Sequence, residues 1–199
     1  MGRVVAMFML VISALAATTT AARATGFVVD VDALGAFPFG TLASGRGAAD
    51  LLDTGYGVRA ELLYEVEEYF SAGLSVSGFS HSASVPIGAI LADANLTAIP
   101  VHALARLHAL REGGFAYYAE TGIGIAAWNL NPLGAGLDPR TQTTFSFSLG
   151  AGASYLLNRR WDVRAGAQYQ QALTGSGQVW ERGDDPKFVI LSLGAHFQY

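Results

Sequence analysis

Two long stretches of apolar–polar alternation limit the possible folds of this chain more than any other feature. In TTFSFSLGAGASYLL, residues 143–157, every second residue from Phe145 onward is apolar, and Ser, Thr or Gly occupies positions 144–154 between them. The closing stretch, FVILSLGAHFQY, repeats the pattern over residues 188–199. A period of two residues is typical of a β-strand with one apolar face. Both stretches exceed the ~5–6 residues usual for soluble strands, so they predict unusually long strands.

The same pattern along the rest of the chain predicts an all-β protein with eight strands. Their ranges are 26–38, 55–67, 69–80, 96–110, 114–128, 143–157, 161–172 and 187–199. The predicted connections alternate between long and short, with long loops expected over residues 81–95 and 129–140. Strands that each cross a bilayer need ~9–11 residues, and short periplasmic turns alternate with long outer loops in membrane barrels. The sequence therefore predicts an eight-stranded antiparallel up-and-down transmembrane β-barrel.

The aromatic residues on the apolar faces favour a membrane barrel over a soluble one. They lie near both ends of the predicted strands, as at Tyr155 and Trp161 on one side and Tyr56 and Phe145 on the other. The middle positions, such as Leu149, are aliphatic or small and uncharged. Membrane barrels carry aromatic girdles at the two interfaces. Beyond residue 24 no segment has 18 consecutive apolar residues, so helical spans are not expected.

The N-terminal 24 residues have the pattern of a secretory signal peptide. Arg3 precedes an apolar stretch over residues 4–17, and Ala22-Arg23-Ala24 is a small-x-small cleavage site. Fourteen apolar residues are too few for the ~20 of a spanning helix. We therefore expect a signal peptide over residues 1–24, with cleavage set by Ala22 and Ala24, and one barrel domain over residues 25–199.

Charge and cysteine content exclude some classes of function. Removing Arg3 and Arg23 from the 12 basic residues leaves 10 against 16 acidic residues, a net charge of −6. An acidic chain of this kind argues against a nucleic-acid partner. The sequence has no cysteine, so neither a disulfide framework nor a lipidated N-terminal cysteine is expected.

The combination of signal peptide, eight amphipathic strands, long loops and a C-terminal strand ending in an aromatic residue resembles the small OmpA-like and opacity-porin-like outer-membrane barrels. The resemblance implies a monomer in the outer membrane of a Gram-negative-type bacterium, surrounded by lipids and lipopolysaccharide. In that family the barrel-assembly machinery reads the terminal strand, and Gly194, Phe197 and Tyr199 match the positions that it reads. The resemblance also implies a structural or surface-interaction role, such as envelope integrity, adhesion or ligand capture by the loops.

The inward faces of the predicted strands carry many ionisable residues. These are Asp30, Asp32, Arg59, Glu61, Glu65, His102, Arg106, His108, Glu120, Asp162, Arg164 and His196. A tight turn near residues 111–114 places Arg106 opposite Glu120 and His108 opposite Tyr118. Because eight strands leave an interior that side chains fill, and because buried charges must be paired, we expect a structural network of ion pairs.

Three alternatives compete with a structural network: two involve these residues, and one involves residues 79–84. A single metal ion cannot join His102 and His108, which lie six residues and roughly 20 Å apart on one strand. A narrow porin-like channel is the third choice, because the interior is too small. The second choice is a lipid A-modifying enzyme, since Ser80-His81-Ser82 is similar to the His-x-Ser-Asn motif of lipid A deacylases, but position 83 is Ala and no Asn follows. We therefore expect neither a catalytic residue nor a metal or other cofactor.

Overall fold

The computed structural model describes residues 26–40, 51–67, 69–87, 90–109, 114–133, 138–158, 160–174, 179 and 185–198. The predicted signal peptide and Tyr199 lie outside these residues. The described chain forms eight strands: β1 (Phe27–Phe39), β2 (Gly55–Glu67), β3 (Phe70–Ile87), β4 (Ile90–His108), β5 (Phe115–Pro132), β6 (Arg140–Asn158), β7 (Trp161–Leu173) and β8 (Lys187–Gln198). The prediction of eight strands is confirmed.

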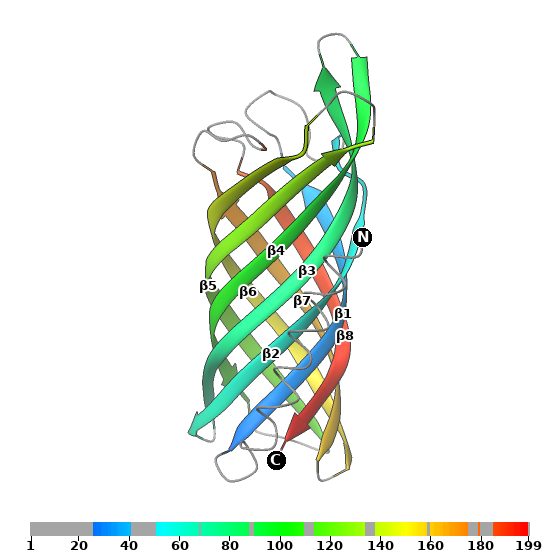
Figure 1. Ribbon diagram of the computed structural model, residues 1–199. Coiled ribbons are helices and arrows are strands. Elements are labelled where there is room, and N and C mark those ends of the chain that lie inside the picture. The colour runs from blue at the N-terminus through cyan, green and yellow to red at the C-terminus, as the bar shows by residue number, and fades with distance from the viewer. Residues whose placement is uncertain are drawn as a thin grey trace.

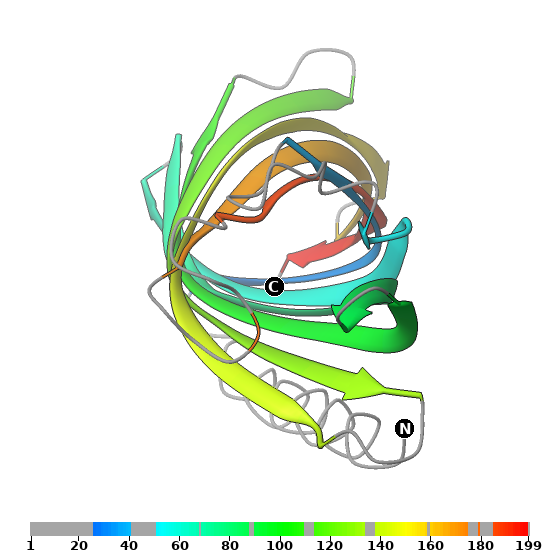
Figure 2. The ribbon, with the colours of Figure 1, turned by 90° about the horizontal axis from the view of Figure 1, so that it is seen from above.

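Each strand pairs antiparallel with the next, and β8 pairs with β1, so that the sheet closes into a barrel (Figures 1 and 2). The seam between β1 and β8 runs from Val28↔Gln198 to Phe39↔Lys187. The predicted pairing of the last strand with the first is therefore confirmed. The predicted cross-strand pairs Arg106↔Glu120 and His108↔Tyr118 are also present between β4 and β5.

The strands differ in length around the barrel, and this corrects part of the sequence prediction. Strands β3 to β6 have 18 or 19 residues, whereas the other four have 12 or 13. The predicted loop over residues 81–95 is wrong, because most of it continues β3 and β4 as a paired hairpin that projects at one end (Figure 1). The hairpin continues because its backbone stays paired and Ala83 and Ala94 pack inward.

The two ends of the barrel are distinct. At one end, called the turn end, short connections follow Glu67, His108 and Asn158. At the other, called the loop end, lie the β3–β4 hairpin and the connections after Phe39, Pro132 and Leu173. In an outer-membrane barrel the turn end faces the periplasm.

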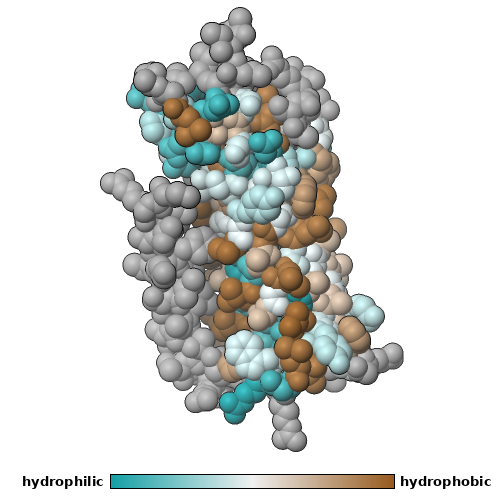
Figure 3. Space-filling view, turned by 90° about the vertical axis from the view of Figure 1, so that its right-hand side faces the viewer, coloured by the Kyte–Doolittle hydropathy of each residue, from teal (hydrophilic) through white to brown (hydrophobic). Residues whose placement is uncertain are grey.

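The outward face of the barrel is apolar over its middle. Leu149 and Leu193 are each 62% exposed, and Leu74, Ile123 and Leu191 also point outward. Figure 3 shows hydrophobic side chains over the lower and middle part of one side, with hydrophilic side chains toward its two ends. The described residues contain no helix that is long and apolar enough to cross a membrane. An apolar band of this kind on a closed barrel faces lipid.

Candidate functional site

The inward-facing residues form two closed layers inside the barrel. Inward positions alternate with outward ones along each strand, so the sequence decides the content of each layer. Toward the turn end, the inward positions of β1, β2, β4, β5 and β7 carry charged residues. Toward the loop end, inward positions of β1, β3, β4, β5, β7 and β8 carry aliphatic and aromatic residues. These layers are called the ion cluster and the apolar layer.

The ion cluster contains three arginines and four carboxylates from five strands. Its members are Asp30, Asp32, Arg59, Glu61, Arg106, Glu120 and Arg164. All seven are buried, with 0–4% of each residue exposed. Single unpaired charges in such a place would each cost several kcal/mol, so the arrangement depends on mutual pairing.

Arg106 is bound on three sides. Its Nη1 donates to Asp30 Oδ2 at 2.7 Å, and its Nη2 donates to Glu120 Oε2 at 2.7 Å and also to Glu61. These carboxylates come from β1, β5 and β2, so a single guanidinium on β4 joins four strands. Charge-assisted hydrogen bonds are roughly twice as strong as neutral ones. Arg106 therefore connects β1, β2, β4 and β5 through the interior of the barrel.

Arg164 and Arg59 complete the pairing. Arg164 Nη1 pairs with Asp30 and donates to Glu61 Oε2 at 2.9 Å. Arg59 lies 2.8 Å from Asp32 and 3.2 Å from Glu120. Every carboxylate in the cluster therefore lies within ion-pair distance of at least one arginine.

Two neighbouring residues shape the cluster. The ring of Tyr118 lies against the guanidinium groups of Arg106 and Arg164, with centroid distances of 4.8 and 5.1 Å. Such cation–π contacts contribute more when water is excluded. On β8, Gly194 leaves space for the cluster, because a Cβ at this position would overlap the side chain of Asp32 and the backbone oxygen of Val31. Glycine is required here by packing at the β1–β8 seam.

The remaining predicted interior residues lie around the cluster, each histidine with its own partner. His196 Nδ1 lies 2.6 Å from Asp30 Oδ1, His102 Nε2 lies 2.6 Å from Ser146 Oγ, and His108 Nε2 lies 2.9 Å from Ser71 Oγ. Asp162 is buried near Ser154, and Glu65 is partly exposed toward the turn end. No group of three His, Cys, Asp or Glu side chains able to hold a metal ion occurs within the described residues.

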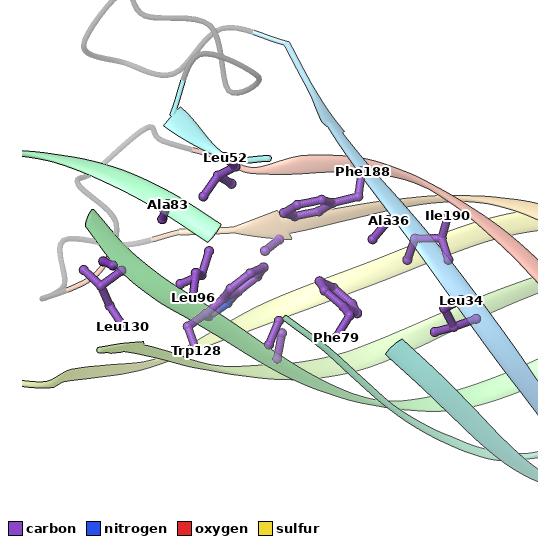
Figure 4. Packing of buried hydrophobic residues seen from close by; sticks show 14 residues of the cluster. Leu34, Ala36, Leu52, Phe79, Ala83, Leu96, Trp128, Leu130, Phe188 and Ile190 are labelled. Atoms are coloured by element: carbon purple, nitrogen blue, oxygen red, sulfur yellow. The ribbon is translucent and has the colours of Figure 1, made fainter. Parts of the chain in front are cut away.

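The apolar layer fills the lumen closer to the loop end (Figure 4). Phe188 on β8 stacks on Trp128 of β5 with a centroid distance of 5.9 Å, and also contacts Phe79 of β3 at 5.6 Å. Since β3, β5 and β8 lie on different sides of the barrel, their rings meet across the lumen. Trp128 also donates from Nε1 to Thr144 Oγ1 at 2.8 Å. The rings occupy the lumen at this level.

The connection between β1 and β2 contributes to the same layer. Leu52 packs into it and forms an isolated bridge with Ala83, and Leu51 and Val179 pack against it. The charged inward positions do not predict this layer. The signal was present in the same alternation, in Leu34, Ala36 and Ile190 among others.

The serines near His81 do not lie with it. His81 points inward, is almost fully buried, and lies 2.7 Å through Nδ1 from the backbone oxygen of Asp53. Ser80 and Ser82 are exposed on the opposite face of β3. A serine nucleophile and its histidine base must be within hydrogen-bond reach. The resemblance of this stretch to a deacylase motif has no matching geometry.

The residues proposed as an assembly signal lie on both faces of β8. Phe197 packs its ring on Trp161 of β7, with centroids 4.5 Å apart, near the turn end. Gly194 faces the interior, where it has the packing role described above. Tyr199 lies outside the described residues.

Comparison with known proteins agrees with this architecture. The chain is similar in structure to Neisserial surface protein A, with a TM-score of 0.61 and 18% identity over 87% of this chain and 97% of that chain. It is similar to OprG from Pseudomonas aeruginosa (TM-score 0.60, 13% identity, 88% and 96%) and to Ail, the attachment invasion locus protein of Yersinia pestis (0.53, 14%, 88% and 99%). No curated protein gives a significant match. The family model of the outer membrane protein beta-barrel domain matches residues 6–198. Since this match spans almost the whole chain, the protein belongs to the outer membrane protein β-barrel family and resides in the outer membrane of a Gram-negative-type bacterium.

Proposed function

We propose that this protein is a closed, non-conducting barrel whose role is structural or is performed by its surface outside the lumen. The observation that carries this proposal is the presence of two filled layers, the ion cluster and the apolar layer, one above the other. An eight-stranded barrel has an interior just wide enough for side chains. A role in envelope integrity, adhesion or ligand capture needs no open lumen.

A surface role is supported by the position of the loop end. The apolar layer fixes the β1–β2 connection through Leu52 and packs against Val179 in the β7–β8 connection. Loops held on a rigid scaffold commonly carry recognition. The printed name of Ail refers to attachment and invasion by that protein. For the present chain we propose the general role of a surface-interacting barrel.

We propose further that the protein acts as a monomer in contact with lipopolysaccharide, and that the barrel-assembly machinery reads its C-terminal strand. A barrel closed by one chain has no unpaired edge that would require a second copy. The outward position of Phe197 at the turn end supports a role in assembly. Gly194 has a packing role that also accounts for its presence.

We propose no catalytic role. This is supported by the opposite orientations of His81 and its neighbouring serines, and by the engagement of the interior carboxylates with arginines. A lipid A-modifying activity would require a nucleophile and base that meet at the membrane surface. Mass spectrometry of lipid A from cells with and without the protein tests this point, and a changed acyl pattern would refute the proposal.

Conductance across planar lipid bilayers tests the closed lumen. The wild-type barrel is expected to give no steady current, while a wide porin in the same bilayers serves as the positive control. Phe188→Ala combined with Trp128→Ala removes the rings that occupy the apolar layer, but the ion cluster remains in place. This variant is also expected to be silent. A steady current through the wild-type protein would overturn the proposed function.

A further inference from the structure

On the outward face of the barrel, apolar residues are replaced by polar residues at one row of paired positions. Ser80 on β3 lies opposite Thr97 on β4, Thr97 lies opposite Asn129 on β5, and Asn129 lies opposite Thr141 on β6. Directly paired residues on adjacent strands point to the same side of a sheet. The four side chains therefore form one continuous polar row across four strands.

A second row lies above the first, toward the loop end. It consists of Ser82, Asn95 and Asn131, which are paired directly with one another. Ser84 and Asp93 form a further pair beyond it. Because these residues are two or four positions from the first row, they point to the same outward side. The hydroxyl and amide residues of these rows, with Ser84, are called the hydroxyl–amide face: Ser80, Ser82, Ser84, Asn95, Thr97, Asn129, Asn131 and Thr141. The carboxylate of Asp93 borders this face at its loop end.

The position of this face is set by the apolar band beneath it. Outward residues are apolar or glycine from Phe70 to Gly78 on β3 and from Ile99 to Leu107 on β4. Each stretch covers nine residues, which matches the ~9–11 residues of a tilted strand that crosses a bilayer. The hydroxyl–amide face therefore begins where the hydrocarbon ends. It lies at the depth of the lipid headgroups, on the side that faces neighbouring lipids.

The composition of the face indicates the kind of partner. Phosphate groups are usually held by Arg or Lys, and neither occurs among the residues of this face. Protein interfaces have a core rich in aromatic and apolar side chains, which this face also lacks. Hydroxyl and amide groups both donate and accept hydrogen bonds without charge. They are complementary to the hydroxyl groups of a sugar.

A residue beside the first row also suits a saccharide. Tyr56 on β2 pairs with Ser80 and is 74% exposed, so the first row ends in an accessible aromatic ring. Side chains with an apolar body and a polar tip suit the boundary between hydrocarbon and water.

We propose that the hydroxyl–amide face binds the oligosaccharide of glycolipids in the surrounding outer leaflet. The proposal rests on the outer-membrane setting and the lipopolysaccharide contact of the proposed function, and it adds the part of the glycolipid that is bound and the site that binds it. The neighbouring glycolipid is the favoured source, because the face borders the lipid band directly and points sideways. Free saccharide from the medium would instead reach the loop end first.

The test measures glycolipid binding to barrels in nanodiscs of phosphatidylcholine. Fluorescent lipopolysaccharide with a complete core oligosaccharide is compared with fluorescent lipid A that lacks the core sugars. The variant combines Ser80→Ala, Thr97→Ala and Asn129→Ala. The control is Thr121→Ala, which removes an outward hydroxyl of β5 within the lipid band. Heat-modifiable mobility on gels checks that each barrel is folded.

The triple variant is expected to bind core-bearing lipopolysaccharide about tenfold more weakly, as for the loss of one to two hydrogen bonds. Its binding of lipid A, and both affinities of the control, are expected to be unchanged. Equal affinity of wild type and triple variant for core-bearing lipopolysaccharide would overturn the proposal. A loss of affinity for lipid A as large as the loss for core-bearing lipopolysaccharide would also overturn it. If the triple variant does not fold, Ser82→Ala combined with Asn95→Ala in the second row replaces it.

Two further outcomes distinguish other occupants. Association of barrels with one another in the absence of glycolipid, lost in the triple variant, would assign the face to a second copy and overturn the proposal. Soluble core oligosaccharide that binds as tightly as the membrane-anchored form would assign it to free saccharide, with the same consequence. Because conductance is measured separately, failure of this inference leaves the proposal of a closed lumen standing.

Discussion

Removal of Arg106 should destabilise the barrel more than any other single truncation in the ion cluster. Arg106→Ala takes one guanidinium from three carboxylates at once. The cluster changes from four carboxylates against three arginines to four against two. Breaking a buried ion pair by removing one partner typically costs about 3–5 kcal/mol. We expect a loss in the free energy of unfolding within this range.

The structure also predicts how this loss depends on Glu120. Glu120 lies near Arg59 as well as Arg106, while Asp30 and Glu61 are also held by Arg164. Glu120→Ala leaves Arg106 paired with Asp30 and Glu61, and it leaves Arg59 paired with Asp32. The loss in the free energy of unfolding should therefore be smaller than for Arg106→Ala. The double variant has the same net charge in the cluster as the wild type. Its loss in the free energy of unfolding should therefore be smaller than the sum of the two single losses by about 1–3 kcal/mol.

The assay is urea unfolding of protein reconstituted in lipid vesicles, followed by tryptophan fluorescence. Arg160→Ala, in the exposed turn between β6 and β7, is the matched control and should change stability by no more than about 0.5 kcal/mol. A loss for Arg106→Ala that is as small as the control would refute the reasoning. Strictly additive losses at Arg106 and Glu120 would show that the two side chains do not interact.

Three other perturbations test separate parts of the structure. Arg in place of Leu149 or Leu193, near the bilayer midplane, should lower the free energy of unfolding by about 2–4 kcal/mol, and Arg in place of Phe145, closer to an interface, should lower it less. Unfolding titrations of lipid-reconstituted protein measure this difference, which a soluble barrel would not show. Phe188→Ala should cost about 3–5 kcal/mol in the same titration, because it removes ring contacts between β8 and two other strands, β3 and β5, and a loss below about 1 kcal/mol would contradict the packing of the apolar layer. Deletion of residues 197–199 should leave the protein degraded or aggregated in the periplasm, as judged by fractionation and immunoblotting, whereas normal outer-membrane levels would remove the assembly role.

The alternation of residues predicted the architecture because it determines which side chains face lipid. The assignment of Leu149 outward and Glu120 inward follows from parity alone, and one tight turn was enough to predict the pairing of Glu120 with Arg106. The apolar–polar alternation does not show at which residue the pairing between two strands ends. Residues 81–95 contain Ser, Pro and Asp, which resemble loop composition, yet backbone pairing and the inward packing of Ala83 continue the strands.

The partners within the interior could not be predicted from the sequence. The sequence predicts only Glu120 as a partner of Arg106, because only neighbouring strands have a predictable register. Its contacts with Asp30 and Glu61 cross the lumen, and they depend on barrel diameter and shear. The same holds for Phe188 and Trp128, whose rings meet only once the barrel has closed.

The contacts across the lumen also determine when the interior can form during folding. Arg164 and Asp30 are 134 residues apart in the chain, and His196 and Asp30, which are paired neighbours at the β1–β8 seam, are 166 residues apart. Such distant contacts form only after a large loss of chain entropy, so they come late. Until β8 reaches β1, the arginines and carboxylates of the cluster remain hydrated. Pairs between adjacent strands, such as Arg106 with Glu120, can form before closure, whereas the contacts of Asp30 with Arg164 and His196 need β8 in place. Closure removes the remaining water and completes the cluster.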